Sequence, residues 1–135
     1  MDSIRVVVVD DENLARQRIR RLMTDFPDMQ IVDECGDGES AVKSVRKNRP
    51  DLLFLDVRMP GMDGFAVLDS LEPELIPVTI FVTAYDQYAL KAFEAQAIDF
   101  LLKPFDRERF GKAVERARQY LSPMVMICEI ALCLC

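Results

Sequence analysis

Ile4-Arg5-Val6-Val7-Val8-Val9 is the stretch that decides the fold, and Asp10-Asp11 follows it directly. A continuous run of β-branched residues is typical of a strand buried on both faces of a parallel sheet. The two acidic residues end the run, where the chain is expected to leave the sheet. The stretch therefore predicts a buried parallel strand with carboxylates at its carboxyl end.

The rest of the chain alternates similar apolar runs with segments of helical periodicity, separated by turn residues. We predict further strands at 30–35, 51–55, 78–82 and 98–102, and helices at 12–25, 37–49, 87–95 and 106–120 with a short one ending at 71. Five strands alternating with five helices predict an α/β fold. Its sheet is expected to be doubly wound, five-stranded and parallel, in the order 2-1-3-4-5.

Composition bounds the possible functions. The 135 residues are about enough for one domain, and the proportions of 50% hydrophobic and 30% charged residues are those of a soluble globular protein. The net charge of −6 argues against this chain itself gripping nucleic acid, because neutralising phosphates needs a basic face. Since the chain has no histidine, its chemistry must use carboxylates, hydroxyls, lysine or thiols.

The cysteines and the last residues bear on location and on domain limits. The four cysteines match no zinc spacing, and the polar start resembles no secretory signal, so we expect a reducing, cytoplasmic location with Cys35 buried.

Residues 1–121 are predicted to form the domain. Residues 122–135 are mostly apolar but too short for a membrane span of about 20 residues. They are interpreted as a truncation scar or non-native read-through, or else as a natural tail packed on the domain.

Polar residues close four of the predicted strands. Asp10 and Asp11 end the first strand, Asp56 the third, Thr83 the fourth and Lys103 the fifth. In open parallel α/β sheets, ligands bind at the carboxyl ends of the strands, where the strand order reverses. We therefore expect three carboxylates, a hydroxyl and an ammonium to meet in one crevice.

Three carboxylates brought close together repel one another, and a hard divalent cation relieves that repulsion. Mg²⁺ prefers carboxylate, carbonyl and water oxygens in octahedral geometry. A carboxylate can also accept phosphate covalently. The Lys103 ammonium and the Thr83 hydroxyl could then contact phosphoryl oxygens.

Four motifs carry a family resemblance. They are Val8-Val9-Asp10-Asp11-Glu12, Leu55-Asp56-Val57-Arg58-Met59-Pro60-Gly61-Met62-Asp63-Gly64, Val82-Thr83-Ala84 and Leu102-Lys103-Pro104-Phe105. In this order they resemble the signatures of response-regulator receiver domains of two-component systems, over residues 4 to about 121. The resemblance implies the flavodoxin-like receiver fold and a phosphoryl-accepting switch that is not an enzyme in the usual sense.

The resemblance also assigns roles. It implies Asp56 as the phosphoacceptor, with Mg²⁺ held by Asp10, Asp11, Asp56 and the backbone carbonyl of Arg58, and with Thr83, Phe100 and Lys103 as switch and phosphate-reading residues. It implies a cis Lys103-Pro104 bond. A histidine kinase or acetyl phosphate would supply the phosphoryl group. The surface formed by helix 87–95, strand 98–102 and helix 106–120 would then act in homodimerisation or output docking.

Two stretches, 84–94 and 99–105, look most like the subgroup whose output is a LytTR-type DNA-binding domain. No such domain follows here, so the resemblance implies a chain truncated before its output domain. DNA would be contacted only through that missing half. Phe100 departs from the family's frequent tyrosine and lacks its hydroxyl.

Other readings of the same residues remain open at this point. A metal-dependent phosphatase or mutase needs an Asp-x-Asp pair on the first strand, whereas the aspartates here are adjacent. An FMN carrier needs a loop after that strand that binds the FMN phosphate. Here the acidic residues Asp10-Asp11-Glu12 stand at that place and would repel the phosphate. One aspartate of the pair could simply cap a helix, and Lys103 and the arginines of helix 106–120 could be solvated.

Overall fold

The computed structural model describes residues 3–121 and confirms the predicted sheet. Its five strands are β1 (Ile4–Val9), β2 (Met29–Cys35), β3 (Leu52–Asp56), β4 (Val78–Thr83) and β5 (Asp99–Leu102). All four pairings are parallel, and the order is β2-β1-β3-β4-β5. The interpretation of residues 122–135 lies outside the described residues.

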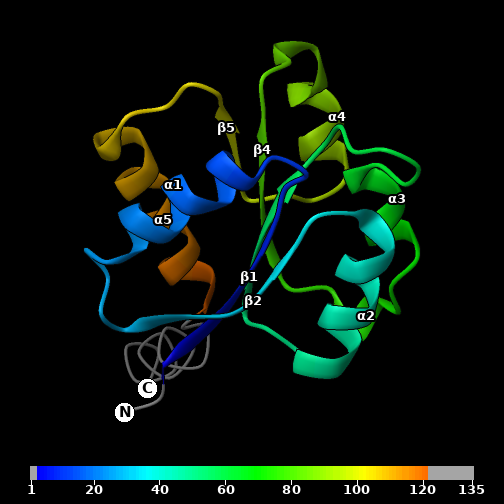
Figure 1. Cartoon of the computed structure of the whole chain (residues 1–135), viewed down its shortest axis with the longest axis horizontal. Coiled ribbons are helices and arrows are strands. Elements are labelled where there is room, and N and C mark those ends of the chain that lie inside the picture. Colours follow the sequence, from blue (N-terminus) through cyan, green and yellow to red (C-terminus); the bar gives the residue numbers. More distant parts are fainter. Residues whose placement is uncertain (1–2, 122–135) are drawn as a thin grey trace, which may run out of the picture.

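Helices cover both faces of the sheet. They are α1 (Asn13–Met23), α2 (Gly38–Asn48), α3 (Gly64–Asp69), α4 (Ala89–Glu94) and α5 (Arg107–Leu121), with short 3-10 turns η1 (Pro73–Leu75) and η2 (Asp86–Tyr88). Helices α1 and α5 lie on one side of the sheet, and α2, α3 and α4 lie on the other (Figure 1). The helix predicted at 87–95 begins instead with η2, because the Ala89 N–H bonds back three residues to the Asp86 carbonyl.

Strand β1 divides the core into two halves. Val7 and Val9 pack with α2, α3 and α4, whereas Val6 and Val8 pack with α1 and α5. All four side chains are almost completely inaccessible to water. Burial on both faces explains why this run is continuously apolar, with no alternation of polar residues. The two cores hold the carboxyl ends of β1 and β3 in fixed register.

The turn after β3 folds back closely on the strand end. The Gly64 N–H donates to the Val57 carbonyl at 2.8 Å, and a Cβ on Gly64 would lie 2.5 Å from the Asp56 carbonyl oxygen. Only glycine fits such an approach without a shift of the backbone. The Asp63 carboxylate then caps α3 by accepting from the Ala66 N–H at 2.8 Å. This tight turn fixes where the Asp56 side chain leaves the sheet.

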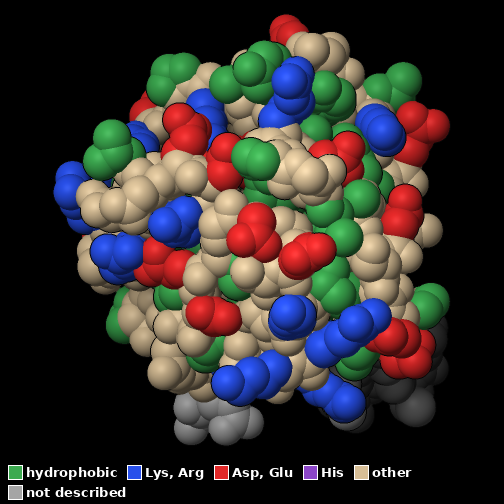
Figure 2. Space-filling view, turned by 45° about the vertical axis from the view of Figure 1, so that its right-hand side comes forward, with side chains coloured by type: hydrophobic (Ala, Val, Ile, Leu, Met, Phe, Trp, Pro, Cys, Tyr) green, Lys and Arg blue, Asp and Glu red, His purple; other side chains and the backbone are tan. Residues whose placement is uncertain are grey.

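The surface of the described part of the chain carries both signs of charge. Acidic and basic side chains are interspersed with hydrophobic ones on the face shown in Figure 2. The α5 arginines are less uniformly solvated than predicted, because Arg109 binds the buried Asp99 carboxylate through two N–H groups and Arg118 does the same to Asp28. Within residues 3–121, every helix falls short of the length and apolarity that a bilayer crossing requires.

Candidate functional site

Three aspartates meet at the carboxyl edge of the sheet, as predicted from the strand ends. Asp10 and Asp11 follow β1, and Asp56 ends the neighbouring strand β3. One carboxylate oxygen from each lies within 4.8 Å of the others. Asp10 and Asp56 are only 1% and 4% exposed, whereas Asp11 is exposed. Neither Asp10 nor Asp11 caps α1, whose N-cap residue is Glu12.

Lys103 supplies the positive charge of this cluster. Its Nζ lies 2.8 Å from Asp10 Oδ2, 2.9 Å from Glu12 Oε1 and 3.5 Å from Asp56 Oδ2. Burial disfavours the charged ammonium, but the Asp10 and Glu12 carboxylates outweigh burial and raise the pKa of Lys103 above its usual range. Lys103 therefore lies in the crevice as predicted, and the alternative of a solvated lysine does not hold. The Lys103-Pro104 peptide bond is cis, as the family resemblance implies.

The site is an open cleft of about 540 Å³, lined by Asp11, Glu12, Asp56, Arg58, Met59, Pro60, Thr83, Ala84, Tyr85 and Lys103. Thr83 is fully buried below it, and its Oγ1 accepts from the Tyr85 N–H at 3.4 Å. The Arg58 guanidinium stacks over the Tyr85 ring, 4.9 Å from the ring centroid. Phe100 lies apart from this lining, because it packs on β5 against the core beneath α2, α3 and α4.

Burial and a neighbouring acid change the acidity of Asp56. Loss of water disfavours the charged carboxylate, and the Asp10 charge adds repulsion. The Lys103 ammonium and the Arg58 N–H, which lies 3.3 Å from Asp56 Oδ1, act in the opposite direction. The net effect raises the pKa of Asp56 to about 7 in the absence of a metal ion.

This pKa predicts a pH-dependent stability in metal-free buffer. An acid whose pKa is raised by folding stabilises the folded state below its ordinary pKa, and that contribution is lost as the pH rises through the folded value. Between its ordinary value of 3.8 and about 7, Asp56 should therefore remove stability as the pH rises. Urea unfolding with EDTA should show Asp56→Asn to be more stable than wild type at neutral pH, by roughly 1–3 kcal/mol. Equal stabilities at neutral pH would contradict this.

The donor set fits a hard divalent cation. Asp10 Oδ2 is buried and accepts no hydrogen bond from the described residues, although the Lys103 ammonium forms an ion pair with it. The cleft holds more carboxylates than ammonium groups, and a further cation would neutralise the remaining negative charge. Carboxylate oxygens are ligands that Mg²⁺ prefers, and this cluster brings three of them together.

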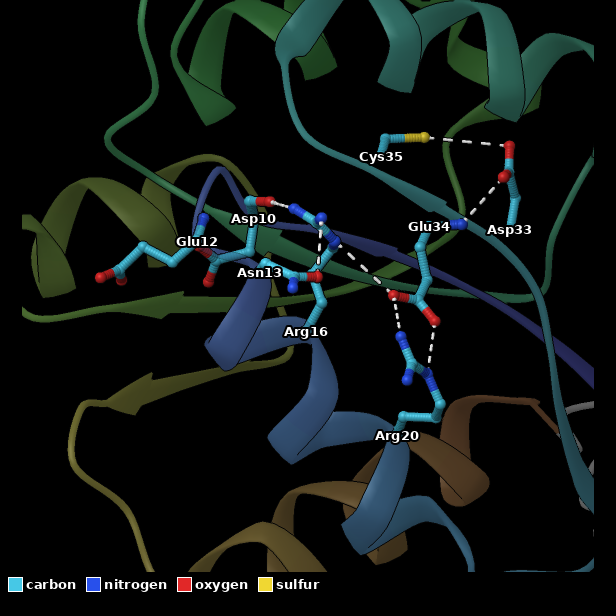
Figure 3. Close-up of polar contacts among 8 residues, drawn as sticks. All are labelled: Asp10, Glu12, Asn13, Arg16, Arg20, Asp33, Glu34 and Cys35. Carbon is cyan, nitrogen blue, oxygen red and sulfur yellow. Dashed lines mark hydrogen bonds and ion pairs between the residues drawn. The ribbon is translucent and has the colours of Figure 1, made fainter.

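Two charged residues of the site were not singled out by the sequence alone. Glu12 pairs with Lys103, and its place directly after the acidic pair was the only signal. Arg16 on α1 bonds to the Asp10 backbone carbonyl (Figure 3). An arginine one turn into an amphipathic helix gives no sequence signal for such a contact.

The fold and the acidic cleft define a receiver domain, and comparison with known sequences confirms it. The chain belongs to the response regulator receiver domain family, whose sequence model matches residues 6–115. It is thus a phosphoryl-accepting signalling switch. The phosphatase and FMN-carrier readings are set aside by this membership.

Particular relatives give the match more detail. The chain is 47% identical over 116 residues to the transcriptional regulatory protein BtsR of Salmonella typhi, and 46% identical to BtsR of Escherichia coli K12. These matches cover 86% of this chain and 48% of each relative, so the chain spans about half the length of the curated relatives it matches.

Solved structures of receiver domains are also similar to this chain. The receiver domain of AraT from Geobacillus stearothermophilus matches with a TM-score of 0.80 and 34% identity, covering 89% of this chain and 96% of that one. The response regulatory domain of MrkE from Klebsiella pneumoniae matches with a TM-score of 0.79 and 30% identity, covering 88% and 98%.

Proposed function

We propose that Asp56 accepts the phosphoryl group, with Mg²⁺ held by Asp10, Asp11, Asp56 and the backbone carbonyl of Arg58. The convergence of the three carboxylates carries this proposal. Of the three, Asp56 is the one that both lines the cleft and forms an ion pair with Lys103, at 3.5 Å. The direct test is incubation with acetyl phosphate and Mg²⁺, followed by mass measurement of wild type and Asp56→Asn.

The reaction follows from these positions. An Asp56 carboxylate oxygen attacks phosphorus, forming an O–P bond as the bond to the histidine nitrogen of a kinase, or to the acyl oxygen of acetyl phosphate, breaks. Mg²⁺ held by these carboxylates would supply charge neutralisation for the phosphoryl oxygens. Lys103 keeps its proton because of its raised pKa, so its ammonium is available to a phosphoryl oxygen. Attack of water on the phosphoryl group later regenerates the carboxylate.

The added charge of about −2 would act on β4 and β5. The Thr83 hydroxyl, which now accepts from the Tyr85 N–H, can rotate to donate to a phosphoryl oxygen. That change moves the loop after β4, of which Tyr85 is part, toward the site. Lys103 donates its backbone N–H to the Thr83 carbonyl at 2.8 Å, so the two residues that read the phosphate are joined. Phe100 on β5, which pairs with Phe81 two residues before Thr83, is the aromatic expected to respond.

The output is proposed from the relatives. Because BtsR is named a transcriptional regulator and this chain covers 48% of it, we propose that the receiver domain, residues 1–121, controls a DNA-binding output domain of the LytTR type. A cytoplasmic histidine kinase is the proposed phosphodonor. The excess of acidic residues supports a role in which this domain does not grip DNA itself.

The face formed by α4, β5 and α5 is the proposed dimer or output surface. Leu90 and Phe93 on α4 and Leu102 on β5 are 72%, 54% and 42% exposed there. With BeF₃⁻ and Mg²⁺ as a phosphoryl mimic, sedimentation should show the wild-type chain shifting toward dimer. Leu90→Asp should weaken this dimer by roughly tenfold or more, because it buries a charge in an apolar contact.

Leu14→Asp is the matched control. Leu14 is 77% exposed, as open as Leu90, but it belongs to α1, which lies on the side of the sheet opposite to α4 (Figure 1). Its variant should dimerise like wild type. A loss of the dimer in Leu14→Asp alone would place the interface on α1 and overturn the proposed face.

A further inference from the structure

We propose that Arg16 is a positioning residue for the metal site, holding the main chain of Asp10 so that its carboxylate points into the cleft. The inference rests on the proposed function, since it concerns how the chain prepares the same acidic site. Arg16 contributes no ligand atom of its own. It lies on α1, behind the strand end that bears the aspartates.

The contacts of Arg16 join three segments (Figure 3). Its Nη1 donates to the Asp10 backbone carbonyl, and its Nη2 donates to Asn13 Oδ1 at 3.2 Å. Its Nε lies 3.6 Å from Glu34 Oε1 on β2. The side chain is only 19% exposed, so the guanidinium is largely sheltered between helix and sheet edge. A planar fork of N–H groups can hold several acceptors in fixed directions at once.

The Asp10 main chain is thereby held on both sides of its Cα. Its N–H donates to the Cys35 carbonyl at 3.0 Å, and its carbonyl accepts from Arg16. The Asp10 carboxylate is buried, with Oδ1 accepting from the Glu12 N–H at 2.9 Å and Oδ2 forming an ion pair with the Lys103 ammonium at 2.8 Å but accepting no hydrogen bond from the described residues. Since the side chain extends from this fixed backbone, the place of Oδ2 in the cleft depends on the Arg16 contact. Removing a group that orients a metal ligand by a hydrogen bond typically lowers the metal affinity by about 10- to 100-fold.

Arg20 offers a matched comparison on the same helix. It binds the same Glu34 carboxylate through two N–H groups, at 2.7 and 2.8 Å. Its side chain is 53% exposed, and among the described residues its only polar contact is Glu34 (Figure 3). Arg20 thus shares the charge, the helix and the partner of Arg16 without touching Asp10.

Electrostatics and positioning predict opposite signs for removing Arg16. Taking a cation away from an acidic cleft strengthens the attraction for a divalent ion, so charge alone predicts tighter binding. Loss of the bond to the Asp10 carbonyl loosens a ligand and predicts weaker binding. A weaker affinity can therefore be attributed to positioning, and the two effects are separable in one measurement.

The experiment is calorimetric titration of Mg²⁺ into the full chain for wild type, Arg16→Gln and Arg20→Gln. We expect Arg16→Gln to bind Mg²⁺ roughly tenfold more weakly. Arg20→Gln should bind within about twofold of wild type, on the tighter side. Arg16→Lys keeps the positive charge but lacks the planar guanidinium, so this variant should also bind Mg²⁺ more weakly than wild type. It replaces Arg16→Gln in the comparison if Arg16→Gln fails to fold. Thermal melts identify a variant that does not fold.

The outcomes separate this inference from the proposed function. A wild-type chain that binds no Mg²⁺ would overturn both. Wild-type binding with an unchanged affinity in Arg16→Gln and Arg16→Lys would overturn the positioning role alone. Equal weakening by Arg20→Gln would also overturn it, because the effect would then come from Glu34 or from the helix, not from the Asp10 carbonyl.

Discussion

Asp56→Asn should acquire no phosphoryl group from acetyl phosphate and Mg²⁺, whereas wild type should gain the mass of one. The amide nitrogen and oxygen of asparagine lack the charge that makes the carboxylate a nucleophile. The substitution keeps the size of a side chain that is 4% exposed, so the core around β3 is undisturbed. Intact-protein mass spectrometry measures the result directly.

Asp69→Asn is the control for Asp56→Asn. Asp69 ends α3 on the surface, outside the cleft lining. This variant should be phosphorylated as wild type is. If Asp56→Asn gained the same mass, the acceptor would be a different residue. Peptide mapping would then show whether Asp10 or Asp11 carries it.

Asp10→Asn should remove the stabilisation that Mg²⁺ gives the folded chain. Replacing the buried carboxylate by an amide deletes the oxygen that lacks a hydrogen bond, and we expect the affinity to fall by roughly 100-fold. At a Mg²⁺ concentration of about 100 times the wild-type Kd, wild type should gain about 2.7 kcal/mol of unfolding free energy. The variant should gain only about 0.4 kcal/mol at that concentration. Urea unfolding with Mg²⁺ and with EDTA gives both values.

Glu12→Gln tests whether any acidic side chain of the cleft is needed for the stabilisation by Mg²⁺. Glu12 pairs with Lys103 as closely as Asp10 does, but it is well exposed and lies outside the three-aspartate cluster. We expect Glu12→Gln to keep nearly all of the Mg²⁺-dependent stabilisation. A loss as large as that of Asp10→Asn would mean that the net charge of the cleft, not the ligand geometry, determines binding.

The fold could be predicted because each central strand is buried on both faces. Burial leaves a continuous apolar run that ends abruptly in a polar residue, as at Val9 to Asp10 and at Leu55 to Asp56. The meeting of these ends follows from sheet topology alone, so the acidic cluster was also predictable. The roles of Arg58 and Phe100 stay predictions, since they depend on a bound ion and a modified state.

The side-chain partners could not be predicted, because they depend on distances across the fold. The sequence marks Arg16, Arg20 and Arg109 as similar polar positions on helices. In the folded chain, Arg16 donates to a backbone carbonyl, Arg20 binds the partly buried Glu34, and Arg109 neutralises the buried Asp99. Helical periodicity predicts the side of the helix on which a residue lies, but not which atom of another segment lies opposite its side chain. The 3-10 turn before α4 was missed for a similar reason, since it continues the helical pattern.

In the resting protein, the Lys103 ammonium serves as the counter-ion of the clustered carboxylates. This ammonium touches Asp10, Glu12 and Asp56 together, so the clustered acids are partly neutralised before any metal arrives. A bound Mg²⁺ would take over part of that neutralisation, and the Lys103 ammonium, 3.5 Å from Asp56 Oδ2, would then be within reach of a group attached to Asp56. On the proposed function, Lys103 would thereby couple binding of the metal ion to recognition of the phosphoryl group.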